Sequence, residues 1–445
     1  MSETIVINAG GIIQNPDAEL LENITLVASD GVIESISRTE YALIPDDITR
    51  TYDFPNSYLM PGLVDTHVHL IMPGDGRPPD QFVQQNNDLD LLLMAQHNAK
   101  MAVLGGVTTL RDVGSRGQIV LTLRDAIQNC LAIGPRIIAS GSPITITGGH
   151  CHYLGGEADG VEQVRTKARE ILKLGADLVK VMGSGGGTPR TNPWRASFGV
   201  AELQAAALEA HRHNVHITVH ASCAEATRFA CEAGVDMIEH AAMWVISDSG
   251  PQHEFDVRLV DNIVHRGIYV GPTLQASYCE ILHLNTLNEQ RALTHLEQDR
   301  LDHKRRLFDN TMETVRRMKA HGALLVSGTD AGWDYNSFLG GAYIDLELAS
   351  EVGMSNREII DFSTRRAAQS VGLGDQIGAL ESGYSADLLV VSGNPADDIS
   401  VIQCPEAVFL VVNCESLMEV FICQAIWNSN NLLNVLYWLG YLITI

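Results

Sequence analysis

Hydrophobic and polar residues alternate in two different ways along this chain of 445 residues. Near both ends, over residues 4–37 and 385–413, short apolar runs are broken by Gly, Asn and Asp, which predicts β-strands joined by turns. The pair Asp30-Gly31 lies between two such runs and indicates a tight hairpin. Strand-rich pieces at opposite ends of a chain can close into one small β-domain, with the middle of the chain inserted between them.

The middle has a different rhythm, in which apolar strand-like runs alternate with longer helix-like stretches. The strand-like runs fall at residues 63–70, 107–113, 136–141, 176–183, 216–221, 236–241, 268–274 and 323–330, and the helix-like stretches include residues 159–175, 199–214 and 223–234. Eight apolar strands, each followed by a crossover, are typical of a (β/α)8 TIM barrel, whose strands are buried on both faces. We therefore predict an α/β fold with this barrel over residues 61–365 and a small composite β-sandwich domain over residues 1–60 and 366–420.

The composition narrows the choice of partners. The chain has 30 Lys and Arg against 54 Asp and Glu, a net charge of −24, which disfavours nucleic acid and anionic membrane surfaces and leaves a small-molecule substrate as the expected partner. The eight cysteines form no C-x-x-C pair, so we expect reduced, buried thiols. Because the chain does not start with a basic stretch followed by an apolar run, we predict a cytoplasmic protein.

The last segment departs from this globular texture. Residues 432–445 are strongly apolar, yet they are fewer than the roughly 20 residues that a membrane span needs. We expect the tail over residues 421–445 to pack on the body of the protein or on a second subunit, which leaves a homo-oligomer open. A membrane contact is the alternative that we place second.

Six polar side chains stand at the ends of predicted barrel strands, where the chemistry of such barrels lies. They are His67, His69, Lys180, His220, His240 and Asp330. His67 and His69 are two residues apart on one strand, so they point the same way. A single histidine or lysine of this kind is commonly a packed or salt-bridged residue, but six that occur in strand order favour a metal site.

The residue types in this set suit divalent metals. Imidazole and carboxylate ligands fit zinc, which we expect first, and also cobalt, manganese, nickel or iron. Lys180 is the unusual member, because an ammonium group repels cations. Burial and nearby positive charge lower the pKa of an amine, and the neutral amine can capture CO2 as a carbamate, an anion with two oxygens. Such a carbamate can bridge two metals, so Lys180 is compatible with the metal site that the other five residues favour.

Loops at the same end of the barrel offer groups that could bind a substrate carboxylate. His150 and His152 lie in the loop after the third strand, and Arg190 lies in the loop after the fourth. Each is a substrate-binding candidate, with an ordinary loop residue as the alternative. Arg111 and Asp112 end the second strand, and we predict either a buried pair that holds a metal ligand or a structural ion pair.

The sequence around the six residues resembles the amidohydrolase superfamily in its binuclear form. The matching stretches are DTHVHL (65–70), ADLVKVM (176–182), TVHAS (218–222), IEHAA (238–242) and SGTDAG (327–332). The resemblance implies that His67, His69 and Asp330 hold the more buried metal. By the same resemblance, His220 and His240 hold the second metal, and carboxylated Lys180 bridges the two.

A narrower likeness points to the imidazolonepropionase-related branch of that superfamily. It rests on GVTTLRDVG (106–114), TGGHCHYLGGEADGVEQVR (147–165), GADLVKVMGSGG (175–186) and GNPADDISVI (393–402). The branch includes dipeptidases that act on Xaa-Pro or Xaa-Arg/Lys substrates, ochratoxin-type amidases, and hydrolases of ureas and thiocarbamates. The stretch HASC (220–223) departs from many relatives, which have Gly or Tyr soon after the His-Ala pair.

We therefore expect a binuclear metal-dependent amidohydrolase that cleaves a C–N bond in a dipeptide or an N-acyl amino acid. A metal-bridging hydroxide would be the nucleophile, Asp330 the proton shuttle and His240 an assisting catalytic residue. Hydrolysis of a urea, a carbamate or a cyclic amide at the same site is the alternative. A mononuclear deaminase fits less well because of Lys180, and a non-catalytic scaffold would be expected to lack several of the six residues.

Overall fold

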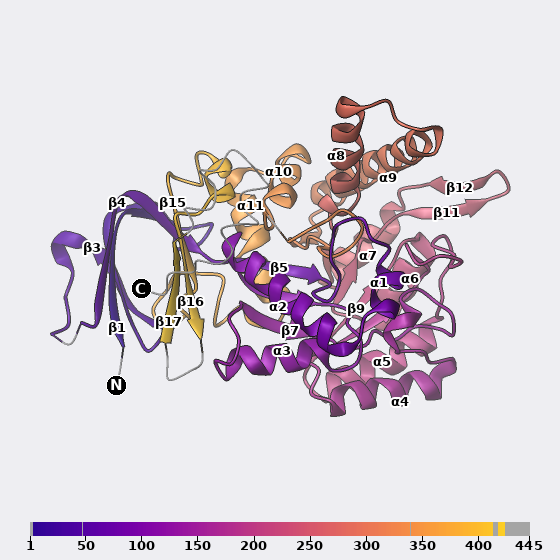
Figure 1. The fold of residues 1–445 in the computed structure, drawn as a ribbon, viewed down its shortest axis with the longest axis horizontal. Coiled ribbons are helices and arrows are strands. Elements are labelled where there is room, and N and C mark those ends of the chain that lie inside the picture. Colours follow the sequence, from indigo (N-terminus) through magenta and orange to yellow (C-terminus); the bar gives the residue numbers. More distant parts are fainter. Residues whose placement is uncertain (1–2, 47, 339, 413–416, 423–445) are drawn as a thin grey trace.

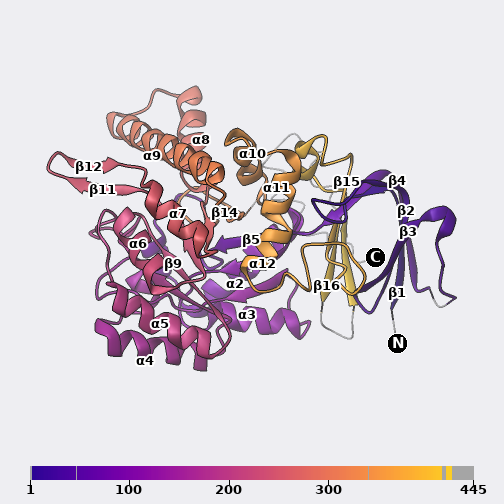
Figure 2. The same cartoon turned by 180° about the vertical axis from the view of Figure 1, so that it is seen from behind.

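The computed structural model describes residues 3–46, 48–338, 340–412 and 417–422. Figures 1 and 2 show two parts side by side: a β-sheet that carries the first and the last described strands, and a larger body of alternating strands and helices. From residue 423 onward, the predicted apolar tail lies outside the described residues. Within the described part of the chain, no helix has both the length and the hydropathy to cross a membrane.

Seven strands from the two ends of the chain form one mixed sheet. They are β1 (Thr4–Ile12), β2 (Leu21–Ser29), β3 (Val32–Arg38), β4 (Arg50–Pro61), β15 (Leu388–Val391), β16 (Ala407–Val412) and β17 (Leu417–Ile422). Their order is β17-β16-β15-β4-β1-β2-β3, so the two chain ends meet where β4 pairs with β15. The predicted union of both ends is confirmed. The expected sandwich is replaced by a single sheet, since hydrogen bonds connect all seven strands.

The turn between β2 and β3 is the predicted hairpin. Asp30 and Gly31 have φ values of 52° and 75°, as a two-residue turn that matches the twist of its strands requires. A Cβ atom on Gly31 would lie only 2.5 Å from Cγ1 of Val411 in β16, so the close packing of β16 also excludes a side chain at position 31. The turn therefore sets both the register of the hairpin and its contact with the last strands.

Alternate residues of these strands build a separate apolar core. Ile5 and Ile7 of β1 belong to it, together with Phe409 of β16. Phe409 is fully buried, and its ring packs edge-on against Tyr52 and Phe54, with ring centroids 5.1 and 6.3 Å away. Strands with one buried face typically alternate in this way.

Eight parallel strands form the larger body, and they match the eight predicted runs. They are β5 (Leu63–Val68), β6 (Val107–Asp112), β7 (Arg136–Ala139), β8 (Leu178–Met182), β9 (His216–His220), β10 (Met237–Glu239), β13 (Tyr269–Gly271) and β14 (Leu324–Leu325). Hydrogen bonds join them as β5-β6-β7 and as β8-β9-β10-β13-β14. Two isolated parallel bridges, Ile144–Val181 and Val68–Ala331, connect these groups at both edges, so the strands follow one another around a ring.

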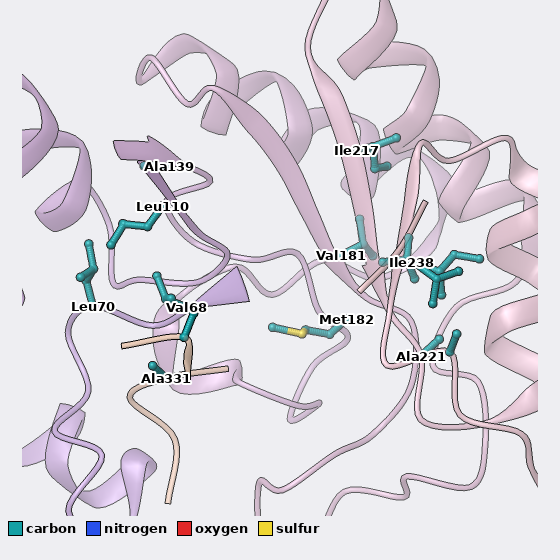
Figure 3. Packing of buried hydrophobic residues seen from close by; sticks show 14 of the residues in the cluster. Val68, Leu70, Leu110, Ala139, Val181, Met182, Ile217, Ala221, Ile238 and Ala331 are labelled. Atoms are coloured by element: carbon teal, nitrogen blue, oxygen red, sulfur yellow. The ribbon is translucent and has the colours of Figure 1, made fainter. Parts of the chain in front are cut away.

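Apolar side chains fill the space around this ring. Figure 3 shows Val68, Leu110, Val181, Ile217 and Ile238, one from each of five strands. All five are fully buried. Parallel strands that are covered on both faces require such continuous apolar runs. This is why polar side chains at the ends of the same strands stand out in the sequence.

Helices pack around the ring and follow most of its strands (Figures 1 and 2). They are α1 (Pro79–Gln85), α2 (Asp88–Leu104), α3 (Ile119–Gln128), α4 (Gly160–Lys173), α5 (Val200–Arg212), α6 (Ala224–Ala233), α7 (Val257–His265), α8 (Gln275–Gln290), α9 (His295–Ala320), α10 (Tyr343–Glu351), α11 (Asn356–Ser363) and α12 (Arg365–Ser370). The three predicted helices correspond to α4, α5 and α6. As predicted, α6 stops at Gly234, which has a φ of 77° and caps the helix end.

Two insertions that the sequence analysis does not anticipate extend beyond the ring. Strands β11 (Trp244–Ser247) and β12 (Gly250–His253) form an antiparallel hairpin after β10, and α8 and α9 form a helical pair after β13 (Figure 1). A hydrogen bond of 2.7 Å between His253 Nε2 and Thr314 Oγ1 joins the hairpin to α9. Both insertions follow strand ends, so they are placed to cover the same end of the ring.

The cysteines agree only in part with the predicted reduced, buried thiols. Cys151, Cys223, Cys231 and Cys279 are free and buried. Cys404 is free but exposed, and Cys130 is disulfide-bonded, so the prediction is wrong for these two.

The packing of Phe409 generates a prediction for stability. Phe409→Ala should lower the free energy of unfolding by about 3–5 kcal/mol, because it removes a buried ring and leaves a cavity between Tyr52 and Phe54. Denaturant titration followed by circular dichroism measures the change. Leu43→Ala, at a position 88% exposed, is the control and should change stability by less than about 0.5 kcal/mol. Equal effects of both substitutions would contradict the described core.

Candidate metal-binding active site

Two histidines and one carboxylate meet where β5 and β14 end. Nε2 of His67 lies 3.4 Å from Oδ1 of Asp330, and Nε2 of His69 lies 3.3 Å from the same oxygen. The backbone brings them together, because the Asp330 amide donates to the His67 carbonyl and the His69 amide donates to the Ala331 carbonyl, at 2.7 and 2.8 Å. One ligand atom from each of the three side chains lies within 4.8 Å of the others, a spacing that one metal ion can span.

The other ring nitrogen of each of these histidines is bound by the protein. Nδ1 of His67 lies 2.9 Å from a carboxylate oxygen of Glu239, and Nδ1 of His69 lies 3.2 Å from the Gly114 carbonyl oxygen. Carboxylate and carbonyl oxygens only accept hydrogen bonds, so both Nδ1 atoms carry the hydrogen. Nε2 of each ring is therefore left as the lone-pair donor that faces Asp330, which is the arrangement of metal-binding histidines.

His220 and His240 follow the same principle at the ends of β9 and β10. Nδ1 of His240 lies 2.7 Å from Oγ1 of Thr273, and Nε2 of His220 lies 3.1 Å from the Gly185 carbonyl oxygen. The centroids of the His220 and His240 rings are 4.7 Å apart, and the centroid of the His240 ring is 5.2 Å from that of the His67 ring. All four predicted imidazoles therefore form one continuous group, and each has a ring nitrogen available for a ligand.

Lys180 is the predicted residue with the most unusual surroundings. It lies on β8, it is 1% exposed, and its Nζ atom has no hydrogen-bond partner among the residues that the structure describes. It lines the same cavity as the four imidazoles and Asp330. Burial lowers the pKa of its amine from 10.5 to about 8. A buried, unpartnered amine is costly unless something else binds it, so this atom calls for a group that the protein itself does not supply.

Burial also sets the protonation of the histidines. It lowers the pKa of His67, His220 and His240 well below the ordinary histidine value, with nearby positive charge adding to the effect. Burial alone would raise the pKa of Asp330, but His67 and His69 beside it keep that pKa below its ordinary value. Neutral imidazoles next to an ionised carboxylate are the forms that bind divalent metals. The chain therefore presents a donor set that fits such ions.

The backbone is held in an uncommon conformation at three of these positions. His240, Thr273 and Asp330 have φ values of 64°, 49° and 59°, although none of them is glycine. Side chains disfavour this left-handed region, and such residues concentrate at functional sites. Here the conformation directs the side chains of His240 and Asp330 toward the cavity, together with that of Thr273, which contacts His240.

A buried carboxylate beneath the imidazoles connects several of these parts. Glu239 is 0% exposed and accepts hydrogen bonds from His67, from Arg111 Nη2 at 2.5 Å and from Thr218 Oγ1 at 2.5 Å. The predicted Arg111–Asp112 pair is wrong. Asp112 accepts instead from the backbone amides of Leu70 and Gly114, since its side chain points away from Arg111 on the alternating strand.

The cavity above these groups has a volume of about 340 Å³, which suits a small molecule. Besides the six predicted residues, its lining includes His150, Met182, Gly186, Gly187, Pro193, Trp194, Ser222, Trp244, Thr273, His303, Lys304, Leu307, Phe308, Thr311, Trp333 and Asp334. His150 is thus where the prediction expects it. His152 and Arg190 are not part of this lining, and their role in substrate binding stays a prediction.

His150 is built into the wall of the cavity. It is 5% exposed, and its Nδ1 lies 2.8 Å from Oγ1 of Thr188. Its ring is 4.6 Å from the ring of His220. A Cβ atom on Gly186 would lie 2.6 Å from His150 Nε2, so glycine allows the loop after β8 to approach this close.

Several residues of the site escape the sequence analysis. Glu239 stands next to His240 in an otherwise apolar strand, so its position in a buried run was an available signal. Trp194 lies in the loop between β8 and α5, and Trp244 and Lys304 lie in the two insertions. The pattern of strands and helices alone carries no information on these contacts.

Comparisons with known proteins show which proteins this chain is similar to. The sequence model of the amidohydrolase family matches residues 58–413. The ochratoxinase of Aspergillus niger is 27% identical in an alignment 443 positions long, and the alignment covers 92% of this chain and 85% of that protein. Its crystal structure superposes with a TM-score of 0.75, covering 92% of this chain and 94% of that one at 26% identity. A crystal structure of a Xaa-Pro dipeptidase with bound methionine superposes with a TM-score of 0.79 at 26% identity, covering 94% and 99%.

The contacts of Glu239 lead to a prediction about metal affinity. In Glu239→Gln one oxygen becomes an amide nitrogen. Arg111 can only donate, so it should take the remaining oxygen and leave the amide facing His67 Nδ1. The His67 hydrogen would then move to Nε2, the ligand position, and affinity for divalent metal should fall about 10- to 100-fold.

Two measurements check this outcome. Competition with a chromogenic chelator gives the metal affinity, and ¹⁵N NMR of labelled histidine in the metal-free protein reports which His67 nitrogen carries the hydrogen. Glu232→Gln, on the exposed surface of α6, is the matched control and should change neither. Unchanged affinity in Glu239→Gln would rule out this orienting role.

Proposed function

The chain belongs to the amidohydrolase family, and from this premise we propose that it is a binuclear metal-dependent hydrolase of a dipeptide or an N-acyl amino acid. It is an amidohydrolase that acts on carbon–nitrogen bonds. The observation that carries the proposal is the cluster of His67, His69 and Asp330, with both Nε2 atoms directed at the carboxylate.

The proposed ligand assignment follows the positions of the side chains. His67, His69 and Asp330 would hold one metal, and His220 and His240 would hold the second. Lys180, as its carbamate, would bridge them. Its buried and unpartnered Nζ, with a pKa lowered to about 8, supports this, because the neutral amine is the form that reacts with CO2. Zinc is the proposed metal.

When bound, divalent metals would supply Lewis acidity and make a water molecule a strong nucleophile near neutral pH. The side chains have complementary roles. Asp330, with its lowered pKa, is ionised and can accept a proton on a carboxylate oxygen, then return it to the departing nitrogen. His150 lines the same cavity and its Nδ1 is held by Thr188, which supports a role in which its Nε2 contacts a substrate oxygen.

The proposed substrate class draws on the relatives. One similar structure is described as a Xaa-Pro dipeptidase, and the similar Aspergillus niger protein is an ochratoxinase. A urea, carbamate or cyclic amide is the second candidate, because the same donor set would act on these bonds. A mononuclear deaminase is less favoured, since Lys180 lies within the group of ligands.

A substrate panel tests the proposal. Protein supplied with Zn²⁺ and bicarbonate is assayed on Xaa-Pro and Xaa-Arg dipeptides, on N-acyl amino acids and on aryl ureas. We expect hydrolysis of dipeptides or N-acyl amino acids, measured by release of the free amine. Activity on ureas alone would favour the second candidate. Hydrolysis of none of these compounds would contradict the proposal.

The bridging role of Lys180 gives a separate prediction. Lys180→Ala should lower kcat/KM by at least about 100-fold, because the loss of a ligand should exceed the loss of a residue that orients one. Added acetate or propionate should restore part of the activity by supplying carboxylate oxygens in the space that the side chain leaves.

Lys173→Ala, at an exposed position of α4, is the control and should behave like the unchanged protein with or without these acids. Full activity of Lys180→Ala without any added acid would exclude the bridging role.

A further inference from the structure

The distribution of tryptophan in this protein is uneven. The chain has five tryptophans, and the three that lie within the described residues, Trp194, Trp244 and Trp333, all line the cavity above the imidazoles. None of the three is fully buried. Tryptophan in a core is normally covered, whereas half-exposed aromatic rings in a concave site are typical of ligand contacts.

The three rings fall into two groups. Trp333 packs near the proposed metal ligands, with its ring 5.8 Å from that of His69 and 5.4 Å from that of His150. Trp194 and Trp244 form a separate pair, with ring centroids 5.0 Å apart and planes inclined by 55°. Trp194 comes from the loop between β8 and α5, and Trp244 begins the β11–β12 hairpin.

Apolar groups accompany this pair. Pro193, Leu307 and Phe308 line the same cavity, and the Phe308 ring is held by Tyr278, with centroids 5.1 Å apart. The hairpin and α9, which lie outside the ring of strands, thus both contribute aromatic side chains to the cavity lining. None of these side chains is among the proposed metal ligands.

The charged side chain that α9 contributes to the cavity lining, that of Lys304, is already compensated. Lys304 Nζ lies 3.2 Å from a carboxylate oxygen of Asp334 and 2.7 Å from one of Glu280, which also pairs with Arg300. Burial lowers the pKa of His303, which favours its neutral form. This wall therefore selects for apolar shape and ring contacts more than for charge.

We propose that Trp194 and Trp244 form a subsite for a planar aromatic group of the substrate, joined to the amide bond that is cleaved. This inference rests on the proposed function and adds a preference among amides. The enzyme selects an aromatic group over a saturated ring of the same size, because ring faces and edges interact favourably with one another in a way that a saturated ring does not.

Two matched pairs of compounds test the preference. One pair is N-benzoyl-alanine and N-cyclohexanecarbonyl-alanine, and the other is N-acetyl-phenylalanine and N-acetyl-cyclohexylalanine. In the pair whose ring reaches the subsite, kcat/KM should be about 3- to 10-fold higher for the aromatic member, the size of one aromatic ring contact. The difference should lie mainly in KM.

The variants Trp194→Leu and Trp244→Leu should remove this preference. The kcat/KM value for the aromatic member should fall to that for the saturated member, so the ratio of the two values reports the subsite. The metal content of each variant is measured separately to show that folding and metal binding are intact. Ile246→Ala, on the same hairpin but outside the cavity lining, is the control and should keep the preference.

The outcomes separate this inference from the proposed function. Equal rates within both pairs would overturn the aromatic subsite and leave the hydrolase assignment standing. If the unchanged protein hydrolyses none of the four compounds, fluorescence titration of the same pairs decides the subsite alone: tighter binding of the aromatic members, lost in both tryptophan variants, supports it, and equal binding overturns it.

Discussion

A single buried carboxylate, that of Glu239, connects the parts on which the rest of the site depends. It accepts hydrogen bonds from a histidine of β5, an arginine of β6 and a threonine of β9, while it lies on β10 itself. An uncompensated charge at such a depth would be very costly, so the Arg111 guanidinium and the two other donors must remain in place. The carboxylate then directs Nε2 of His67 into the cavity, which is the nitrogen a metal would bind.

The same principle extends to the other imidazoles. Backbone carbonyls hold His69 and His220, and the Thr273 hydroxyl contacts His240. These three partners follow three different strands, β6, β8 and β13, so only the closed ring of strands brings them together. The (β/α)8 barrel of the family thus supplies the groups that orient each imidazole ring. The end sheet, with its own core around Phe409, packs beside the ring and contributes none of the residues of the cavity lining that the structure describes.

Much of this could be predicted from the sequence. All eight barrel strands follow from apolar runs, because parallel strands buried on both faces have no other pattern. The convergence of His67, His69 and Asp330 follows in turn, because side chains at the carboxyl ends of such strands meet at one end. Glu239 lies within an apolar strand, and Arg111 pairs with it across the ring and not with its neighbour Asp112. A linear pattern does not say which buried charges will face one another across a ring.

The part of the cavity lining that comes from outside the ring of strands could not be predicted, for a different reason. Trp194, Trp244, Lys304 and Phe308 come from a loop, a hairpin and a long helix, where no periodicity relates position in the chain to position in space. These segments add aromatic side chains and compensated charges to a cavity that also holds the proposed metal ligands. The metal ligands suit many C–N bonds, and the aromatic side chains can give a preference among the substrates.

The most direct test of the account is the metal content of the protein purified in the presence of Zn²⁺ and ¹³C-labelled bicarbonate, measured together with its ¹³C NMR spectrum. The account predicts close to two metal ions per chain and a carbamate carbon signal that is absent from Lys180→Ala. One metal ion or none, or two ions without that signal, would contradict a pair of metals bridged by a modified lysine.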